Sequence, residues 1–308
     1  MNVLIIGLGS IARKHVSALR SLPLDFKIFA LRSSNQADKF HDVVNLFDLD
    51  DKYLVFDFAI ISPPTHLHYH YIELLSKKSI PLFIEKPAVH KLDKVDELLC
   101  LVSEKQVTTY VACNLRFHPC LLFLKNKLNS EKSRINELNI YCGSYLPDWR
   151  SEKDFKKIYS ANASTGGGVH LDLFHELDYV TWLFGFPESS NSITRNVSSL
   201  GINAIDYANY TLQYKTFTAN VVLNYYRRVP KRDIEIVFED RIWTVDLINN
   251  TIKESNGLLL YEAKNFNILE TYNSQLEYFI GCLQNNQKPM NSLQESIPVL
   301  EICLQNEI

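Results

Sequence analysis

The sequence lacks any strong excess of one charge. Its 32 lysines and arginines stand against 35 aspartates and glutamates, which gives a formal net charge of −3. Proteins that hold nucleic acids or anionic membranes carry a basic footprint, and this composition provides none. The sequence also lacks an apolar run long enough to span a bilayer, and residues 2–6 are typical of a strand rather than of a signal peptide. We therefore expect neither a nucleic-acid partner nor a membrane partner.

Clustered cysteines are missing as well. The six cysteines are scattered, and no two stand at metal-ligand spacing: Cys100, Cys113, Cys120, Cys142, Cys282 and Cys303. Most of them lie among apolar residues, which predicts buried, reduced thiols in a cytoplasmic protein. The chain has no internal repeat and no low-complexity tail. With 308 residues, of which 46% are hydrophobic and 22% charged, it has enough apolar material for two globular cores.

What the sequence does contain begins at its N-terminus. The apolar run of residues 3–6 predicts a strand buried on both faces of a parallel sheet, and a glycine-rich turn follows at once. This turn has the dinucleotide-binding pattern G-x-G-x-x-G/A and consists of Gly7, Leu8, Gly9, Ser10, Ile11 and Ala12. Gly7 permits the tight turn, Gly9 lets a pyrophosphate approach the backbone, and Ala12 lets the following helix pack on the strand. We expect all six residues to bind NAD or NADP.

A second predicted strand, residues 26–31, ends in Arg32, Ser33 and Ser34. Proteins that prefer NAD usually offer an acid to the ribose hydroxyls at this point. An arginine and two hydroxyls suit the 2′-phosphate of NADP better, so we expect NADP in preference to NAD. The sequence leaves open the alternative that Arg32 stacks on the adenine or lies in solvent.

Two further apolar strands, residues 56–61 and 80–84, end in turns that carry polar groups. The first turn is Ser62-Pro63-Pro64-Thr65, stiff enough to lie along the nicotinamide side of a cofactor crevice. The second is Glu85-Lys86-Pro87, which places a lysine at the carboxyl end of a strand, where open α/β sheets bind ligands. The Lys86 ammonium can donate to a substrate hydroxyl or carbonyl. In isolation it would also be an ordinary surface lysine.

Three alternating histidines follow the first of these turns, at positions 66, 68 and 70. They would form a metal site only on a strand, because residues two apart do not share a helix face. Thr65 is a suitable helix N-cap, and the apolar pattern of residues 71–75 continues a helix. We therefore expect no metal there.

The stretch from Thr165 to Asp178 combines three consecutive glycines with a predicted helix that carries Asp172 and His175. The glycines allow backbone or a ligand to come close. On a continuous helix Asp172 and His175 project within about 60° of each other, and such a pair can exchange a proton with a bound hydroxyl. Alternatively, Asp172 is a first-turn acid favoured by the helix dipole and His175 is a core histidine.

The chain changes character after about residue 118. Alternating apolar and polar residues predict antiparallel strands at 135–141, 207–214, 218–225, 233–238 and 241–246. The segment 144–165 has little regular pattern but contains Tyr145, Trp149, Arg150 and Tyr159, the composition of a loop that binds a sugar, a carboxylate or a phosphate. A solvated loop with stray aromatics is the other interpretation. Amphipathic helices from residue 272 onward could return to the first domain.

This predicted sheet carries many apolar side chains, more than one helical layer is expected to cover. They are Val221, Leu223, Tyr225, Ile234, Ile236, Phe238, Trp243 and Val245. We therefore expect a homodimer or homotetramer that associates through the sheet of the second domain.

Taken in order, these motifs resemble the Gfo/Idh/MocA family of glucose-fructose oxidoreductase and inositol dehydrogenase. The motifs are Gly7-x-Gly9-x-x-Ala12, Pro64-x-x-x-His68, Glu85-Lys86-Pro87, Asn114-x-Arg116-Phe117-x-Pro119 and Gly166-Gly167-Gly168-x-x-x-Asp172. The resemblance implies an α/β plus α+β protein, with a Rossmann domain at residues 1–118 and a domain with an open, mostly antiparallel sheet at residues 119–308. It also implies oxidation or reduction of a sugar or cyclitol with NAD(P).

The resemblance assigns roles to individual residues. Lys86 matches the family's catalytic lysine and Asp172 its helix-borne acid, while the family's histidine usually follows the acid by four residues, a position held here by Glu176. His175 stands three residues after the acid and takes the catalytic role in our prediction, with Glu176 as the competing candidate. The motif residues complete the predicted site: His68 and Glu85 on the cofactor side, and Asn114 and Arg116 on the substrate side.

The segments 148–150, 159–161 and 175–179 resemble a subset of the family found among bacterial enzymes of surface-sugar synthesis, which indicates an activated or acidic sugar as the substrate. The leading hypothesis is hydride transfer between a nicotinamide and a secondary alcohol, in which His175 or Lys86 takes the hydroxyl proton and Asp172 orients or shares it. Two alternatives remain: glycoside cleavage through transient oxidation by bound NAD, and a dinucleotide sensor without catalytic activity.

Overall fold

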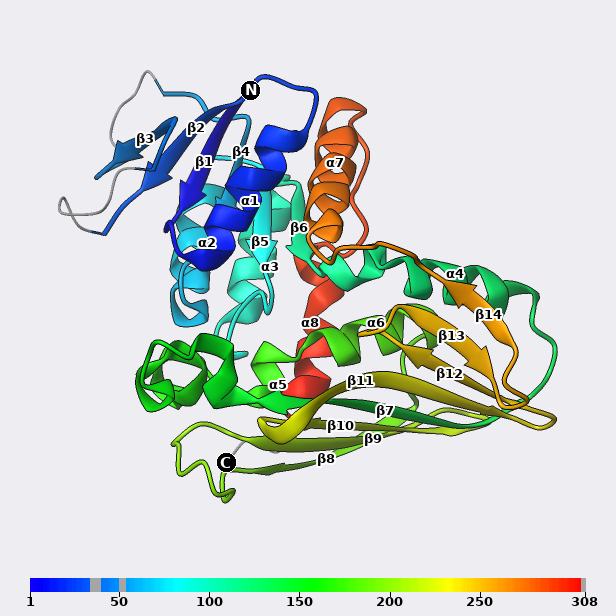
Figure 1. The fold of residues 1–308 in the computed structure, drawn as a ribbon. Helices are drawn as coiled ribbons and strands as arrows, with labels where there is room; N and C mark the ends of the chain where they lie inside the picture. The colour runs from blue at the N-terminus through cyan, green and yellow to red at the C-terminus, as the bar shows by residue number, and fades with distance from the viewer. Residues whose placement is uncertain (34–39, 50–53, 306–308) are drawn as a thin grey trace. The chain divides into compact units, whose positions relative to one another are not determined.

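The computed structural model describes residues 1–33, 40–49 and 54–305, which form two compact units (Figure 1). Unit 1 consists of Met1–Asn114 and Ile268–Pro298, and unit 2 of Leu115–Asn267 and Val299–Ile308. The chain therefore leaves unit 1, builds most of unit 2 and then returns. Among the residues that the structure describes, no helix is both long and apolar enough to cross a membrane.

Unit 1 is built on a parallel sheet of six strands in the order β3-β2-β1-β4-β5-β6. The strands are β1 (Asn2–Ile6), β2 (Lys27–Leu31), β3 (Val43–Leu46), β4 (Phe58–Ile61), β5 (Leu82–Glu85) and β6 (Thr109–Ala112). β1 pairs with β2 on one side and with β4 on the other, so the strand order reverses beside it. This is the doubly wound order that binds dinucleotides at the reversal point, and it confirms the predicted Rossmann fold.

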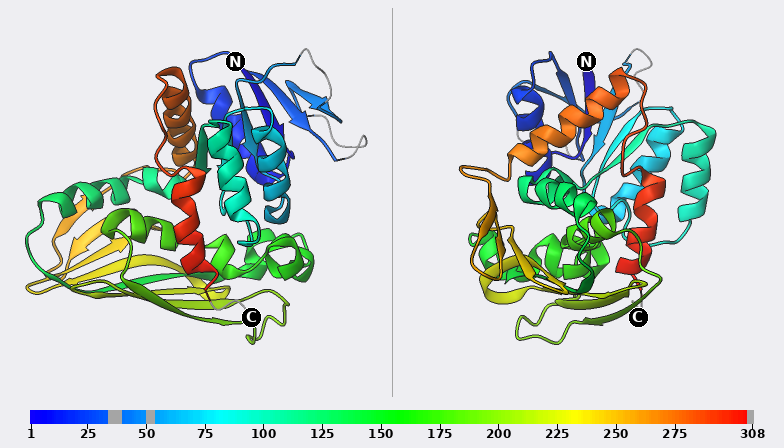
Figure 2. Two further views of the ribbon diagram at one scale, coloured as in Figure 1. Left: turned by 180° about the vertical axis from the view of Figure 1, so that it is seen from behind. Right: turned by 90° about the vertical axis from the view of Figure 1, so that its right-hand side faces the viewer.

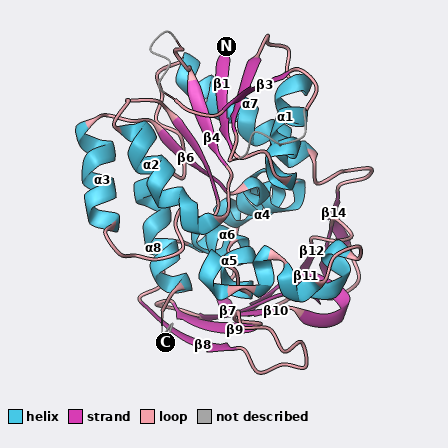
Figure 3. Cartoon of the chain, turned by 90° about the vertical axis from the view of Figure 1, so that its left-hand side faces the viewer, coloured by secondary structure: helices cyan, strands magenta, loops and turns pink. Residues whose placement is uncertain are grey.

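Helices cover both faces of this sheet (Figure 3). They are α1 (Ser10–Ser21), α2 (His68–Ser76), α3 (Val95–Glu104) and α7 (Glu270–Gln284). α7 packs beside α1 and inserts Phe279 into the core, where its ring centroid lies 5.5 Å from that of Phe58 and 5.6 Å from that of Phe83. A helix distant in sequence therefore completes the core of unit 1.

Unit 2 contains an eight-stranded sheet in the order β14-β13-β12-β11-β7-β10-β9-β8. The strands are β7 (Ile135–Tyr145), β8 (Ser189–Arg195), β9 (Tyr207–Gln213), β10 (Thr218–Asn224), β11 (Tyr226–Phe238), β12 (Ile242–Asp246), β13 (Thr251–Glu254) and β14 (Leu259–Glu262). β7 and β10 pair in parallel, and the other neighbouring strands are antiparallel. The mostly antiparallel sheet was predicted, but β8, β13 and β14 were not.

The helices of unit 2 lie on one face of its sheet (Figures 1 and 2). They are α4 (Pro119–Ser130), α5 (Val169–Asp172), α6 (His175–Phe184) and the last part of α8 (Leu293–Cys303), a helix within which the boundary between the units falls. The eight side chains that suggested an uncovered apolar surface are at most 6% exposed and lie in the core. The opposite sides of these strands carry polar, partly exposed residues such as Asn139, Asn220 and Glu235. The apolar argument for association is therefore wrong, because the unit covers these residues itself.

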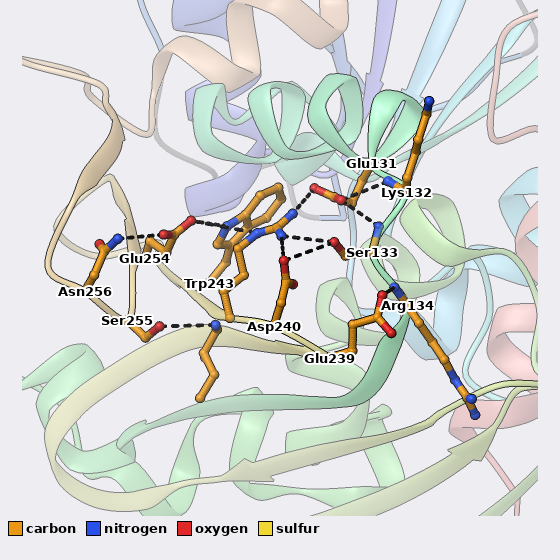
Figure 4. Close-up of polar contacts among 12 residues, drawn as sticks. Glu131, Lys132, Ser133, Arg134, Glu239, Asp240, Trp243, Glu254, Ser255 and Asn256 are labelled. Atoms are coloured by element: carbon orange, nitrogen blue, oxygen red, sulfur yellow. Dashed lines mark hydrogen bonds and ion pairs between the residues drawn. The ribbon is translucent and has the colours of Figure 1, made fainter.

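A charged cluster fixes one end of this sheet (Figure 4). Arg241, just before β12, donates from Nη2 to Glu131 at 2.5 Å and from Nη1 to Asp240 at 2.5 Å and Ser133 at 3.0 Å. Its guanidinium carbon also lies 5.3 Å from the centroid of the Trp243 ring. The hydrogen bond from Arg241 and the two backbone donors outweigh burial and lower the pKa of the Glu131 carboxyl. The cluster joins the end of α4 to the β11–β12 hairpin, whose short turn was predicted.

The single helix predicted after the glycines is two helices. α5 ends at Asp172, Leu173 has φ −98° and ψ 31°, and α6 begins at His175. Leu173 and Phe174, which join the two helices, are both buried. The angle expected between Asp172 and His175 on a continuous helix therefore does not apply.

Candidate active site

The fingerprint turn between β1 and α1 has the geometry that its glycines predict. Gly7 has φ +75°, in the left-handed region, and its N–H donates to the Leu31 carbonyl at 3.1 Å. A Cβ on Gly7 would lie 3.4 Å from the Cα of Pro63. The positive φ of the turn therefore accounts for Gly7, since a Cβ at this distance from Pro63 would be in ordinary van der Waals contact.

Gly9 precedes the first turn of α1, and its carbonyl accepts the N–H of Arg13 at 3.1 Å. A Cβ at Gly9 would meet no atom within 4 Å, so the space in front of the helix is open. Leu8, Ser10 and Ile11 are at least partly exposed around this space, whereas Ala12 is fully buried against the sheet. An open helix N-terminus beside an exposed glycine fits the pyrophosphate of a dinucleotide.

The adenosine side of the predicted cofactor site lies at the end of β2. Arg32 follows this strand, and its Nη1 donates to Oδ1 of Asn45 in β3 at 3.1 Å. Ser33 is exposed, and Ser34 lies outside the described residues. Asn45, which the sequence analysis did not single out, orients the guanidinium that we expect to face the ribose.

His68 contacts both of the turns that we expect to lie on the nicotinamide side of the cofactor site. Its Nε2 lies 2.9 Å from the Pro63 carbonyl oxygen and its Nδ1 3.1 Å from that of Pro87. Burial lowers the pKa of His68, although the carbonyl oxygens and the charge of Glu85 act in the opposite direction. The side chain thus links the turn after β4 to the turn after β5, and it is buried rather than exposed to a cofactor.

Two more residues of the turn after β4 are also buried, Ser62 and Thr65, and Ser62 Oγ donates to the Ile6 carbonyl at 3.2 Å. Pro64 at the tip is exposed. His66 belongs to a short 3-10 helix, Thr65–Leu67, and α2 starts at His68. The predicted helix at this point is therefore confirmed, but Thr65 is not its N-cap: Leu67 precedes α2, and no side chain caps the helix.

Glu85 binds a histidine that the sequence analysis missed. His15 of α1 is fully buried, and its Nε2 lies 2.5 Å from Glu85 Oε1. Burial raises the pKa of the Glu85 carboxyl, but the hydrogen bond with His15 and the charges of His15 and Lys86 outweigh it, so this pKa lies below its ordinary value. The available signal was a histidine on the apolar side of α1, between the buried Ala12 and Leu19.

Lys86 stands at the carboxyl end of β5, as predicted, and it is partly exposed. Its backbone N–H donates to Glu85 Oε2 at 3.3 Å. The buried carboxylate therefore fixes the backbone of the lysine, and through His15 it connects that backbone to the helix of the fingerprint.

In unit 2, the three glycines make room for backbone. A Cβ on Gly167 would lie 2.2 Å from the Tyr159 carbonyl oxygen and 2.8 Å from that of Asn162. Gly166 and Gly168 have φ +82° and +136°. The Tyr159 hydroxyl also donates to the Gly166 carbonyl at 2.6 Å. These contacts pack the loop of residues 159–165 against the start of α5, so backbone rather than a ligand explains Gly167.

Asp172, at the end of α5, accepts a hydrogen bond from the buried Tyr225. The hydroxyl of Tyr225 lies 2.5 Å from Asp172 Oδ2. The ring of Trp149 meets that of Tyr225 edge-on, with centroids 5.3 Å apart. Burial and the charge of Asp172 raise the pKa of Tyr225 well above its ordinary value, so the tyrosine keeps its proton.

Glu176 and His175, the two candidates for the proton carrier, have different surroundings. Glu176 is fully buried, and the Nε of Arg232 donates to its Oε1 at 2.6 Å. Burial lowers the pKa of Arg232, but the charge of Glu176 outweighs it and raises this pKa above its ordinary value. His175, at the first position of α6, is partly exposed. The ion pair occupies Glu176, which favours His175 as the proton carrier.

The predicted substrate residues Asn114 and Arg116 each have a buried partner within their own unit. Asn114 Nδ2 donates to Thr271 Oγ1 at 2.6 Å. Arg116 donates to both carboxylate oxygens of Asp178, from Nε at 3.0 Å and from Nη2 at 2.7 Å. A two-point pair of this kind is a stable structural contact, and it ties the start of unit 2 to α6.

The segment 144–165 brings aromatic and charged side chains together, as its composition predicted. Trp149 is 39% exposed, and its Nε1 donates to Ser144 Oγ at 2.8 Å. The guanidinium carbon of Arg228 lies 3.7 Å from the centroid of the Tyr145 ring. A pocket of about 380 Å³ is lined by Arg150, Lys153, Asp154, Lys157, Ile158 and Tyr159. Lys153 and Lys157 were not among the predicted site residues, although they lie in the same loop.

The fold and the fingerprint define a dinucleotide-binding protein. Residues 1–113 match the family described as oxidoreductases with an NAD-binding Rossmann fold, Gfo/Idh/MocA. Over these residues the match agrees with the family that the sequence motifs predicted.

Two curated relatives are dehydrogenases. The chain is 29% identical over 161 residues to scyllo-inositol 2-dehydrogenase (NADP(+)) IolW of Bacillus subtilis, an alignment that covers 51% of this chain and 43% of that protein. It is 24% identical over 256 residues to UDP-N-acetylglucosamine 3-dehydrogenase of Acidithiobacillus ferrooxidans, covering 80% of this chain and 74% of that protein. The chain thus spans less than half the length of the first relative.

Solved structures share the fold over nearly the whole chain. The structure of the Acidithiobacillus ferrooxidans enzyme, GnnA, has a TM-score of 0.77 at 19% identity, covering 99% of this chain and 96% of that chain. The WlbA dehydrogenase from Bordetella pertussis, in complex with NADH and UDP-GlcNAcA, has a TM-score of 0.80 at 15% identity, covering 98% and 93%. At these identities the likeness establishes the fold.

Proposed function

We propose that the protein is an NAD(P)-dependent oxidoreductase that transfers a hydride between a nicotinamide and a secondary alcohol or ketone of a sugar. The observation that carries this proposal is the open first turn of α1 behind the exposed Gly9, at the reversal point of a parallel sheet. Residues 7–12 would hold the pyrophosphate and Arg32 the ribose side. When bound, the dinucleotide supplies the acceptor or donor of the hydride.

The proton chemistry is assigned to three side chains. The Lys86 ammonium donates to the reacting oxygen, and His175 takes or returns the hydroxyl proton. Asp172 orients the proton carrier or shares its proton. Glu176 is excluded from this set because its carboxylate is buried in the pair with Arg232.

For the substrate, we propose a sugar that carries an anionic group. The pocket lined by Arg150, Lys153 and Lys157 contains three cationic side chains and a single carboxylate, Asp154. Such a lining favours a carboxylate or a diphosphate over a neutral sugar. The UDP-sugars in the names of two similar proteins have the same chemistry.

The activity assay follows the absorbance of reduced nicotinamide with NADP⁺ and with NAD⁺. Substrates are UDP-N-acetylglucosamine, a UDP-linked uronic acid and neutral scyllo-inositol. We expect net cofactor reduction, with larger kcat/KM for the anionic sugars. Dinucleotide binding without turnover of any sugar would identify a sensor instead. Substrate cleavage without net reduction would identify the glycosidase mechanism.

For the cofactor, we propose NADP in preference to NAD. Arg32 ends β2 in the place usually held by an acid in NAD-preferring proteins, and Asn45 holds its guanidinium. We expect Arg32→Asp to weaken NADP binding roughly ten- to a hundredfold, the worth of a charge-assisted hydrogen bond, and NAD binding much less. Calorimetry with both cofactors measures this difference. Lys105→Asp makes the same charge change on an exposed site of unit 1 and should alter neither affinity. Equal losses for NADP and NAD in Arg32→Asp would reverse the preference.

We also propose that the sheet of unit 2 forms the interface of a homodimer or homotetramer in the cytoplasm. The support is the face opposite the helices, whose partly exposed tyrosines, asparagines and threonines include Tyr141, Asn220 and Thr211. All six cysteines are free thiols, as expected of a protein in a reducing compartment.

A further inference from the structure

Tyr225 is held rigidly at the end of β10. Its N–H donates to the Asp206 carbonyl at 3.0 Å, and its own carbonyl accepts the N–H of Leu146 at 2.8 Å. The side chain is fully buried on the helix-covered face of the sheet, with the Trp149 ring against its edge. Backbone and ring are therefore fixed independently of α5, so the position of the hydroxyl is set by the sheet.

The Tyr225 hydroxyl donates its hydrogen bond to Asp172. The distance of 2.5 Å to Oδ2 is in the range of charge-assisted O–H···O⁻ bonds, which are roughly twice as strong as neutral ones. A protonated tyrosine hydroxyl has one hydrogen to donate, and here it points to the carboxylate.

Asp172 needs such support because of where it stands. α5 has four residues, Asp172 is the last of them, and Leu173 leaves the helical conformation. A side chain at the end of so short a helix is only partly oriented by the helix itself, and the bond from Tyr225 adds a constraint from another element. We propose that Tyr225 is a positioning residue, which holds the Asp172 carboxylate oriented for proton transfer. This inference rests on the proposed function, in which Asp172 takes part in catalysis.

The test is Tyr225→Phe, which removes one oxygen and keeps the buried ring. Loss of the bond removes the constraint on the carboxylate, so we expect kcat to fall roughly ten- to a hundredfold with little change in KM or in dinucleotide affinity. A general loss of structure would change KM and the dinucleotide affinity as well. The matched control is Tyr210→Phe, which removes the hydroxyl of another fully buried tyrosine in the same sheet, bonded to the Cys303 carbonyl at 2.8 Å. It should change neither kcat nor KM.

A second measurement does not depend on activity. Carbon NMR of labelled aspartate, assigned with Asp172→Asn, compares the chemical shift of the Asp172 carboxyl carbon in the wild-type protein and in both tyrosine variants. We expect this chemical shift to change in Tyr225→Phe only, because only that variant loses the hydrogen bond. An unchanged chemical shift in a folded Tyr225→Phe variant would overturn the inference, whether or not a sugar is turned over. A changed chemical shift in a protein without turnover would support the contact and reject the proposed function.

Discussion

Lys86→Ala and His175→Ala are both expected to depress turnover while dinucleotide binding stays nearly intact. General acid–base groups contribute about 10² to 10⁴ in rate, so the residue that carries the proton should lose at least about a hundredfold in kcat. The two losses need not be equal, because an ammonium that holds an oxygen and an imidazole that moves a proton make different contributions. Steady-state kinetics gives the turnover, and calorimetry gives the cofactor affinity.

Glu176→Gln is the internal control for this assignment. Its carboxylate is buried against Arg232, and breaking a buried ion pair costs about 3–5 kcal/mol, so the variant should unfold at lower denaturant concentration. The molecules that remain folded should turn over at nearly the wild-type rate. If folded Glu176→Gln is inactive and His175→Ala is active, the proton carrier has been assigned to the wrong residue.

Gly167→Ala is expected to cause a large loss of stability. The new Cβ would lie 2.2 Å from the Tyr159 carbonyl oxygen and 2.8 Å from that of Asn162, and both are backbone atoms that cannot rotate away. Relief requires the loop of residues 159–165 to move off α5. Overpacking commonly costs 1–3 kcal/mol, and a backbone clash of this size should reach about 3 kcal/mol or more. Denaturant titration followed by circular dichroism measures the free energy of unfolding.

Gly281→Ala is the matched control for that variant. Gly281 lies within α7, and a Cβ there would meet nothing within 4 Å. Alanine favours the helical backbone by roughly 0.5–1 kcal/mol over glycine, so this variant should be as stable as the wild type or slightly more stable. Equal stability of the two variants would show that the loop of residues 159–165 is not packed against Gly167.

The sequence was most informative where the structure depends on neighbouring residues. The strand, glycine turn and helix of residues 2–21 could be predicted because each glycine has a local role and the apolar run is continuous. The short edge strands β3 and β8 were not predicted. β3 has no fully buried residue, and β8 consists largely of serine, asparagine and threonine, so neither shows a clear apolar pattern.

The roles of the site residues were harder to predict, because they depend on partners far away in the sequence. Glu85 was assigned to the cofactor, but it binds His15, 70 positions earlier. Glu176 competed with His175 until its pair with Arg232, 56 positions later, was seen. Tyr225 looked like one of many apolar sheet residues, although its hydroxyl contacts Asp172. A single sequence shows which residue types are present but not which of them meet.

Unit 1 is built from two segments that are far apart in the sequence, and this sets the order in which its core can form during synthesis. Met1–Asn114 leave the ribosome first, but α7, which carries Phe279 into their core, follows only after Leu115–Asn267. At 5–20 residues per second this delay is roughly 8 to 30 s. During that time the nascent sheet of unit 1 exposes the apolar surface around Phe58 and Phe83 that Phe279 later covers. Residues 1–114 therefore cannot complete their core until α7 has been synthesised, whereas unit 2 can complete most of its sheet before that.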